Sequence, residues 1–557
     1  MDIIIIGSGI AGLAAAIKAA ENQDNITIIA SFPPVRSQSI MATGGINAAL
    51  DTKGEHDSWT EHFNDTMKAG GYLADEVAVA EMCKKAPELI RHLAQAGVVF
   101  SRDEKGNPDV RNFGGQSKKR TVYAKAGIGR QLVEGLSAVV RYYQAEGKIK
   151  LITNTRFIKC ITIDGRYAGV VCENTDDGSL NFYHSDILIA ASGGMGGLFA
   201  EHTGSCASDG SLTASLLASG VEMANLEMIQ YHPTTVKVGN KRMLISEAAR
   251  GEGGRLFTMK DGKRYYFMED WHGEKGNLMP RDIVSKSIYQ ICDIMKLGLN
   301  NQQQVGLDLT QLSEDTLFNK LKEVSDATKL YLHLDPSKQV IPVYPGVHYF
   351  MGGISTDSFH HTLIAGIYAA GECACIYHGA NRLGGNSLLG AVYGGIKAAN
   401  SGHDDALIND DKRIQQASRL ADSYIKTLTT KMEQQSDADT INYLALQSML
   451  QDIIEKHLGI MRSEATLKQG LQQLKLLQDK HPVLLKRHIS DAIACENFKL
   501  LGEAILKSAC FRQETRGAHI RTDYPKTDDD HFKKTITSFY ENGEIKIRSD
   551  EIGRLFK

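Results

Sequence analysis

The chain has 557 residues with 63 basic and 66 acidic side chains, which gives a formal net charge of −3. A hydrophobic share of 42% with 23% charged residues is typical of a globular protein and excludes a disordered or low-complexity chain. The near-neutral charge argues against a nucleic-acid-binding protein, which would show a basic patch and a high pI. The length suggests about three or four domains, enough to bury a core without disulfide or metal support.

Nine cysteines are scattered along the chain without a C-x-x-C pair. Iron–sulfur clusters and structural zinc sites need thiolates or histidines at close spacing, so we expect no metal site in this chain. A sparse, odd set of cysteines fits a reducing compartment. Met1 leads directly into a predicted strand without a basic leader, and no apolar run approaches the roughly 20 residues that cross a bilayer. We therefore expect a cytoplasmic location.

The first predicted strand, 3–6, is a continuous isoleucine run, as in a strand buried on both faces of a parallel sheet. It leads into a G-x-G-x-x-G motif and then an alanine-rich helix over 13–20. In this setting Gly7 makes a tight turn, Gly9 lets the backbone approach a pyrophosphate, and Gly12 brings helix and strand together. The phosphates would lie at the helix N-terminus. The predicted dinucleotide-binding residues here are Gly7, Gly9, Ile10, Ala11 and Gly12.

A second predicted strand over 26–29 follows the helix. A dinucleotide fingerprint normally has an acidic residue at the end of this strand, where it binds ribose hydroxyls. Here the position holds Ala30 and Ser31, with no carboxylate. Taken alone, the pattern leaves two interpretations open: a weaker ribose contact through Ser31, or a chance match.

Longer motifs decide between them. The segment 36–49 reads R-S-Q-S-I-M-A-T-G-G-I-N-A-A, and further motifs follow in order over nearly the whole chain, at 231–234, 245–254, 280–282, 345–353, 370–372, 378–387 and 514–519. Together they resemble the succinate dehydrogenase/fumarate reductase flavoprotein family, whose flavin loop typically reads R-S-H-[ST]-x-x-A-x-G-G-x.

The resemblance implies an α/β fold with a Rossmann-like FAD-binding domain that is discontinuous, over 1–225 and 338–405. A capping domain of α+β type, over 226–337, would be inserted between these stretches. A helical domain would follow over 406–520, containing periodic stretches at 443–458 and 467–477. The tail over 521–557 is rich in charge and aromatic residues, a composition that suits contact with a neighbouring subunit.

The implied cofactor is FAD. Gly44 and Gly45 would offer backbone donors, and Asp209 and Glu372 would accept from ribose or ribityl hydroxyls. A helix beginning at Ser387 would stabilise negative charge on the reduced flavin. The further residues implied to hold FAD are Ser31, Ser37, Gln38, Ser39, Thr43 and Leu388.

Gln38 departs from the family pattern, because respiratory members attach the flavin covalently through a histidine at this position. An amide cannot act as that nucleophile, so we predict non-covalent FAD. Loss of the histidyl link should lower the flavin potential. We therefore expect the protein to work mainly as a fumarate reductase, with succinate dehydrogenase as the alternative direction.

Fumarate is a planar dianion, so its site needs cationic donors at both carboxylates. By resemblance, Arg382 and His348 hold one carboxylate, while His232 and Ser246 hold the other. Ser246 stands where the family usually has threonine.

For catalysis, the resemblance implies hydride transfer from N5 of reduced FAD with Arg281 as the proton donor. Glu247 and Arg250 would return a proton to Arg281. Taken alone, these two residues would be an ordinary ion pair three positions apart on a helix.

The alternative activity is that of L-aspartate oxidase, a relative that carries a glutamate just before a Gly-Gly pair to meet the substrate ammonium. Here Phe113 stands at that position, and an aromatic ring suits the carbon skeleton of succinate or fumarate instead. A non-catalytic flavin-binding scaffold is disfavoured because the implied site residues are all present.

FAD exchanges two electrons, and no cluster motif or quinone site is readable in the chain. The implied partners are an iron–sulfur subunit and, with it, a membrane-anchor subunit that would hold the protein at the inner face of the membrane. A soluble thiol or flavin as electron donor stays open.

Overall fold

The computed structural model describes the chain apart from residues 126, 206–207, 240, 406–410, 436–439 and 557. Its centre is a five-stranded parallel sheet with the order β19-β10-β1-β2-β6. Its strands are β1 (Asp2–Ile6), β2 (Asn25–Ile29), β6 (Ile149–Ile152), β10 (Ile187–Ala190) and β19 (Ile367–Ala369). All four isoleucines of 3–6 are buried, as predicted for a strand covered on both faces.

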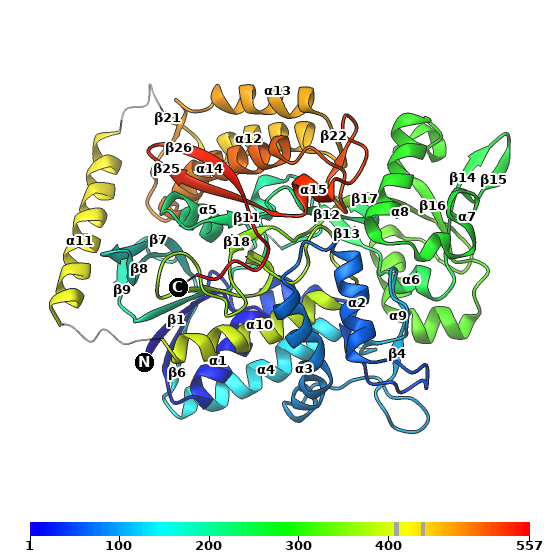
Figure 1. The fold of residues 1–557 in the computed structure, drawn as a ribbon, viewed down its shortest axis with the longest axis horizontal. Helices are drawn as coiled ribbons and strands as arrows, with labels where there is room; N and C mark the ends of the chain where they lie inside the picture. Colours follow the sequence, from blue (N-terminus) through cyan, green and yellow to red (C-terminus); the bar gives the residue numbers. More distant parts are fainter. Residues whose placement is uncertain (126, 206–207, 240, 406–410, 436–439, 557) are drawn as a thin grey trace.

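Helices from distant parts of the sequence cover this sheet (Figure 1). They are α1 (Ile10–Glu21), α3 (Glu76–Gln95), α4 (Ile128–Ala145) and α10 (Asn386–His403). Helices α1 and α10 lie side by side, and a Cβ on Gly395 would come within 2.3 Å of the Ala11 carbonyl oxygen. This close contact joins the two stretches of the FAD-binding domain.

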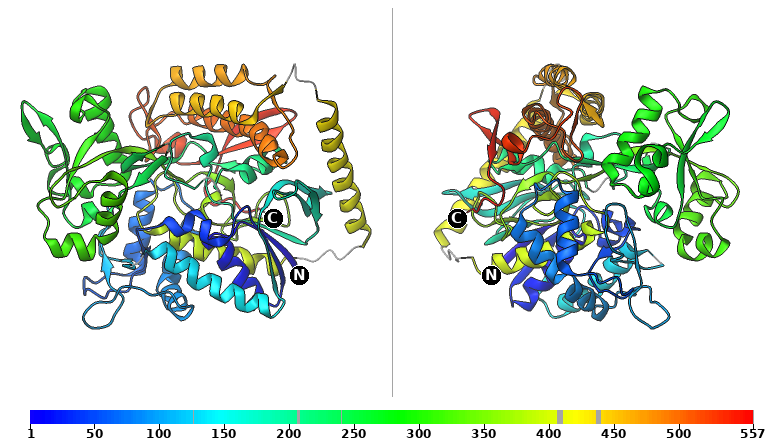
Figure 2. Two further views of the ribbon diagram at one scale, coloured as in Figure 1. Left: turned by 180° about the vertical axis from the view of Figure 1, so that it is seen from behind. Right: turned by 45° about the vertical axis from the view of Figure 1, so that its right-hand side comes forward.

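The capping domain is built on a six-stranded antiparallel sheet with the order β13-β12-β17-β16-β14-β15. It forms the green region at one end of the molecule in Figures 1 and 2. The strands are β12 (Ile229–Val238), β13 (Lys241–Leu244), β14 (Arg255–Lys260), β15 (Lys263–Tyr265), β16 (Val305–Asp308) and β17 (Ile341–Phe350), and α8 (Arg281–Tyr289) packs on β12. Strand β17 follows the boundary predicted at 338, yet it pairs with both β12 and β16. The second FAD-domain stretch thus begins inside the capping sheet.

Two separate groups make up the predicted helical domain. Helices α12 (Tyr443–His457), α13 (Glu464–Lys475) and α14 (Ile489–Phe511) pack on one another, and α14 packs on α5 (Ser211–Ala218). Helix α11 (Asp411–Gln434) instead packs through Ala417 and Ala421 on the sheet β7 (Thr155–Ile163), β8 (Arg166–Asn174) and β9 (Leu180–Tyr183). Figure 2 shows α11 at the edge of the molecule, apart from the other three.

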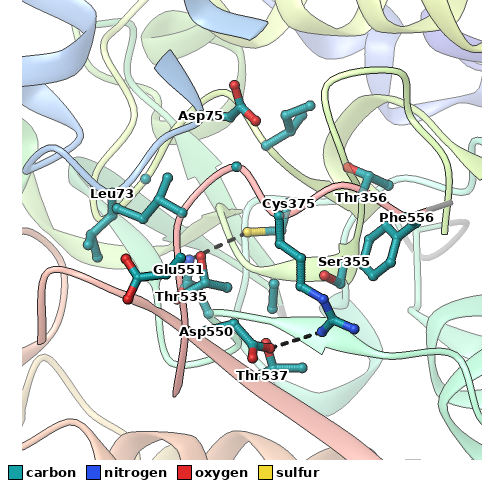
Figure 3. Close-up of a pocket in the computed structure, with 17 residues that line it drawn as sticks. Leu73, Asp75, Ser355, Thr356, Cys375, Thr535, Thr537, Asp550, Glu551 and Phe556 are labelled. Atoms are coloured by element: carbon teal, nitrogen blue, oxygen red, sulfur yellow. Dashed lines mark hydrogen bonds and ion pairs between the residues drawn. The ribbon is translucent and has the colours of Figure 1, made fainter. Parts of the chain in front are cut away.

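The C-terminal tail packs against other parts of the same chain. Strands β25 (Thr535–Glu541) and β26 (Glu544–Asp550) form a hairpin that pairs through β25 with β11 (Met223–Ala224). It thereby extends the sheet that β11 forms with β18 (Gly353–Ser355) and β20 (Ala374–Cys375). Beyond it, Arg554 pairs with Asp550 at 3.2 Å and with Glu222 at 3.1 Å. Figure 3 shows the small cavity under this segment, which Asp550, Phe556 and Cys375 line. The described part of the tail therefore packs within the chain, and its contact with a neighbouring subunit stays a prediction.

None of the helices in the described part of the chain is long and apolar enough to cross a membrane. Within the same residues, no group of three or more His, Cys, Asp or Glu side chains is placed to hold a metal ion. All but one of the described cysteines are buried, and Cys510 is partly exposed.

Candidate active site

A cavity of about 740 Å³ lies between the glycine turn, the loop over 31–43 and the start of α10. Arg242, Met243 and Leu244 of the capping strand β13 form part of its wall. Most of the predicted cofactor residues line it: Gly7, Gly9, Ile10, Ala11, Ser31, Ser37, Gln38, Ser39, Thr43, Asp209, Glu372, Ser387 and Leu388.

The glycine turn has the geometry that the motif predicts. Gly7 has φ +119°, and a Cβ there would lie 2.2 Å from the Ala191 carbonyl oxygen. A Cβ on Gly12 would lie 2.0 Å from the Gly7 carbonyl oxygen, so only glycine lets helix and strand meet. The backbone N–H of Ile10 donates to Ser39 Oγ at 3.1 Å, which ties the turn to the following loop.

Several polar atoms along the cavity wall are buried without a hydrogen-bond partner in the protein: Ser37 Oγ, Gln38 Oε1, Thr43 Oγ1 and Ser192 Oγ. An unsatisfied buried polar group costs about 1–3 kcal/mol, so a group of them at one cavity indicates a polar ligand. A dinucleotide with ribose, pyrophosphate and ring heteroatoms fits this wall. The residues present therefore suit FAD.

Gly44 and Gly45 are not among the cavity-lining residues. Gly45 has φ +149°, and Gly44 packs against Phe113, whose ring would lie 3.3 Å from a Cβ there. The nearby Arg111 guanidinium donates to the carbonyl oxygens of Thr43, at 2.9 Å, and Gly44. Arg111 thus fixes the backbone of the flavin loop through two of its carbonyl oxygens, a role that was not predicted from the sequence.

The two acidic residues predicted to bind FAD differ in their surroundings. Asp209 already accepts from the Ser211 N–H at 2.9 Å and pairs with Arg156 at 2.7 Å, so a ribose hydroxyl would have to share its oxygens. Glu372 accepts one hydrogen bond, from the Phe350 N–H at 3.2 Å. Burial raises the pKa of Glu372 to about 7.

Helix α10 starts at Asn386, one residue before the predicted start. Gly385, with φ +87°, precedes it, and a Cβ there would lie 2.0 Å from Asn47 Oδ1. The buried Asn47 amide donates to Asn386 Oδ1 and to the Gly384 carbonyl oxygen, both at 2.7 Å. This network fixes the helix N-terminus at the cavity.

The structure brings the three predicted catalytic residues into direct contact. Arg281 donates to Glu247 Oε2 through Nε at 2.9 Å and Nη2 at 2.7 Å, and Arg250 pairs with Glu247 Oε1 at 3.3 Å. All three side chains are buried. The N–H of Gly114 donates to Glu247 Oε1 at 3.0 Å, and the Asn277 carbonyl oxygen accepts from Arg250 at 2.5 Å. Although burial alone would raise it, the Arg281 and Arg250 guanidiniums lower the pKa of Glu247.

Gln230 connects this group to the substrate arginine. Its Oε1 accepts from Arg281 Nη1 at 3.0 Å and from Arg382 Nη2 at 3.2 Å. Its Nε2 donates to Asn381 Oδ1 at 2.7 Å and to the Arg382 carbonyl oxygen at 2.9 Å. Sequence reasoning did not identify Gln230. Its position two residues before His232 on a strand was the available signal, because such residues share a face.

His232 and His348 lie together, with ring centroids 5.1 Å apart. The Thr234 N–H donates to His232 Nδ1 at 3.3 Å, so His232 carries its proton on Nε2, which has no partner in the protein. Arg382 Nε is likewise buried without a partner. Burial and the Arg281 guanidinium hold the pKa values of both histidines well below their usual range, so both rings are neutral. Burial and Arg281 also lower the pKa of Arg382 to about 9.

Among the predicted catalytic and substrate-binding side chains, which form this cluster, the charged groups are the three guanidiniums of Arg250, Arg281 and Arg382 and the carboxylate of Glu247. With neutral histidines they leave a buried net charge of +2. A buried charge is costly unless paired, so the cluster favours a dianionic ligand. A dicarboxylate would supply both the missing charge and acceptors for the free donors.

The remaining predicted substrate residues border this cluster. Ser246 is buried at the start of the short helix α6 (Ala248–Gly251), where Ala248 N–H donates to its Oγ at 3.4 Å. Phe113 is buried and packs on Gly44 and Gly384, between the flavin loop and the Glu247 carboxylate held by Gly114. An apolar wall therefore adjoins the cationic cluster.

A dinucleotide cavity on a parallel sheet, covered by a separate domain with buried cations, defines the class of FAD-dependent oxidoreductase flavoproteins. Residues 2–388 match the FAD binding domain family, and residues 447–553 match the family described as Fumarate reductase flavoprotein C-term. The chain belongs to the succinate dehydrogenase/fumarate reductase flavoprotein subunits, as the resemblance predicted.

Flavoprotein subunits named for succinate dehydrogenase and for fumarate reductase are both similar to this chain over nearly its full length. The succinate dehydrogenase flavoprotein subunit of Bacillus subtilis is 37% identical, covering 99% of this chain and 96% of its own. The 8-methylmenaquinol:fumarate reductase flavoprotein subunit of Wolinella succinogenes is 32% identical, covering 98% and 90%. Among solved structures, an E. coli quinol fumarate reductase chain superposes with a TM-score of 0.89 at 28% identity, covering 99% of this chain and 97% of that chain.

Proposed function

We propose that this chain is the catalytic subunit that interconverts fumarate and succinate, working mainly in the direction of fumarate reduction. The observation that carries the proposal is the buried cluster with net charge +2, with free donors on His232 and Arg382. Its charge and donors match a dicarboxylate dianion.

Two pairs of side chains bind the two carboxylates of the substrate. Arg382 and His348 bind one carboxylate, and His232 and Ser246 bind the other, which fixes the carbon skeleton beside Phe113. FAD, when bound, supplies the two electrons as a hydride. The clamps orient and polarise the substrate, so that binding energy is used to reach the transition state.

Arg281 donates the proton to the substrate carbon next to a carboxylate, because a carbanion at that carbon is basic enough to take it. The paired contact with Glu247 Oε2 holds this guanidinium in place as the donor. Glu247, in contact with both Arg281 and Arg250, then passes a proton from Arg250 to Arg281, and Arg250 regains its proton from water. All three side chains are buried, so the proton moves through these contacts, and one proton is taken up from water in each turnover.

The proposal is tested by assaying fumarate reduction with reduced viologen beside oxygen-dependent oxidation of L-aspartate. Rapid fumarate reduction without aspartate oxidation is the expected result. The reverse pattern would assign the chain to L-aspartate oxidase, and neither activity, with FAD bound, would favour a non-catalytic scaffold.

We further propose that FAD is bound without a covalent link, since Gln38 stands where an attaching histidine would be. Denaturation in acid should release the flavin completely into the supernatant and leave a non-fluorescent polypeptide. Flavin fluorescence that stays with the denatured chain would contradict this prediction. The absence of an 8α-histidyl substituent should also lower the flavin potential, which favours electron donation to fumarate. For a two-electron couple, a shift of about 30 mV in potential corresponds to about 1.4 kcal/mol of free energy.

The affinity for FAD should depend on pH through Glu372, whose pKa in the cofactor-free protein burial raises to about 7. A hydroxyl that donates to this carboxyl favours its ionised form. The affinity should therefore fall as the pH drops below about 7 and stay level above it. Titration of the apoprotein with FAD at several pH values measures this. Glu372→Gln should bind FAD with little pH dependence, and an unchanged pH profile in this variant would contradict the assignment.

An iron–sulfur subunit is the proposed electron-transfer partner, with a membrane anchor as a further subunit. FAD exchanges electrons in pairs, and the described residues offer no metal cluster to pass them on singly. Affinity purification from the native host should recover an iron-containing polypeptide in equal amount with this chain. A single polypeptide fully active with its physiological donor would contradict the partner.

A further inference from the structure

Thr203 touches the substrate histidine from a segment that no motif identified. Its Oγ1 lies 2.8 Å from His348 Nδ1, and it lines the cavity. The Thr203 N–H donates to the Val347 carbonyl oxygen at 2.9 Å, so the loop is fixed to strand β17 next to the histidine. The hydroxyl and the ring are therefore held at a defined separation by the backbone.

The other side of the His348 ring determines which nitrogen carries the proton. Arg382 Nη2 lies 3.2 Å from His348 Nε2, and a guanidinium can only donate. Nε2 must then accept, and the proton of the neutral ring lies on Nδ1, which donates to Thr203 Oγ1. Burial and the Arg281 and Arg382 guanidiniums keep the ring neutral by lowering its pKa, so it has one N–H to place.

A bound carboxylate would reverse these roles, because it can only accept. His348 then needs its proton on Nε2: Nδ1 releases a proton to water and Nε2 takes one from water, without change in ring charge. Nδ1 becomes an acceptor, and its partner must donate. A hydroxyl serves both states, since it can donate or accept by rotation.

We propose that Thr203 is a positioning residue that supports both tautomers of His348 and thereby lets this histidine exchange Arg382 for a substrate carboxylate. The inference rests on the proposed dicarboxylate site. It assigns a specificity-supporting role to a side chain outside the family motifs found in the sequence.

The test compares Thr203→Val, which keeps the shape and removes the hydroxyl, with Thr203→Ser, which keeps the hydroxyl. Fumarate turnover is measured with reduced viologen, and binding of malonate, an unreactive dicarboxylate, is measured from the flavin spectrum. Thr203→Val should raise the KM for fumarate and the Kd for malonate about tenfold or more, because the carboxylate must then order a ring that the hydroxyl no longer holds in position. The kcat should change less than about threefold, and Thr203→Ser should restore both constants. Unchanged constants in the valine variant, or equal loss in the serine variant, would overturn the proposal.

A double-mutant cycle with His348→Gln separates positioning from general structure. In that background Thr203→Val should have no further effect on malonate binding, whereas a persistent tenfold loss would mean that Thr203 acts on the fold and not on His348. Thr203→Ala replaces the valine variant if the latter fails to retain FAD. A wild-type protein that neither reduces fumarate nor binds malonate would remove the proposed function itself. If the wild type reduces fumarate and binds malonate, and Thr203→Val does so with the same constants, only the role of Thr203 would be overturned.

Discussion

Arg281→Lys should reduce the turnover of fumarate by about three orders of magnitude while FAD stays bound. Lysine keeps the positive charge but presents a single ammonium in place of a planar fork. It cannot reproduce the paired contact with Glu247 Oε2 and the contact of Nη1 with Gln230 Oε1, so the proton donor moves away from the substrate carbon. Steady-state reduction of fumarate by reduced viologen, normalised to FAD content, measures the loss.

The matched control is Arg264→Lys, an arginine of the same capping domain that pairs with Asp308 and is half-exposed on strand β15. Its turnover should stay close to that of the wild type. If Arg281→Lys retained activity within about tenfold, Arg281 would not be the proton donor.

Gln230→Glu should raise the KM for fumarate by about two orders of magnitude. The amide oxygen of Gln230 is a neutral acceptor for the Arg281 and Arg382 guanidiniums. A carboxylate at this position would pair with both and reduce the buried net charge from +2 to +1, so the cluster would no longer balance a dianion. A malonate titration of the flavin spectrum should show the same loss of affinity without turnover.

Gln230→Leu is the companion variant, because it removes the acceptor without adding charge. Its KM should rise only about tenfold, the effect of two donors that lose a shared partner. If Gln230→Glu bound the dicarboxylate as tightly as Gln230→Leu does, the neutral charge of Gln230 would not be what substrate binding requires.

The sequence by itself determined the features that depend on neighbouring residues. Gly12 is required by the Gly7 carbonyl oxygen five residues before it, and the isoleucine run of 3–6 forms a buried parallel strand as its composition predicts. The motifs identified the family, which the full-length relatives confirm. Local patterns are readable because the residues that make them are close in the chain.

Tertiary structure alone decided how distant segments complete the site. Glu247 is held by the N–H of Gly114, 133 residues away, and His348 by the hydroxyl of Thr203, 145 residues away. Nothing in the local sequence around Thr203 distinguishes it from an ordinary loop threonine. Likewise, the local sequence around Asp209 does not indicate its ion pair with Arg156.

The same reason explains the differences in architecture. The hairpin of β25 and β26 joins the sheet through β11, more than 300 residues earlier, and α11 packs on the β7–β9 sheet rather than on the other C-terminal helices. An amphipathic helix or an alternating strand indicates that one face will be buried, but not which partner covers it. That choice depends on the shape and charge of surfaces assembled from the whole chain. The fold class could therefore be predicted from the sequence, whereas the partners of Gln230, Thr203 and Arg111 required the structure.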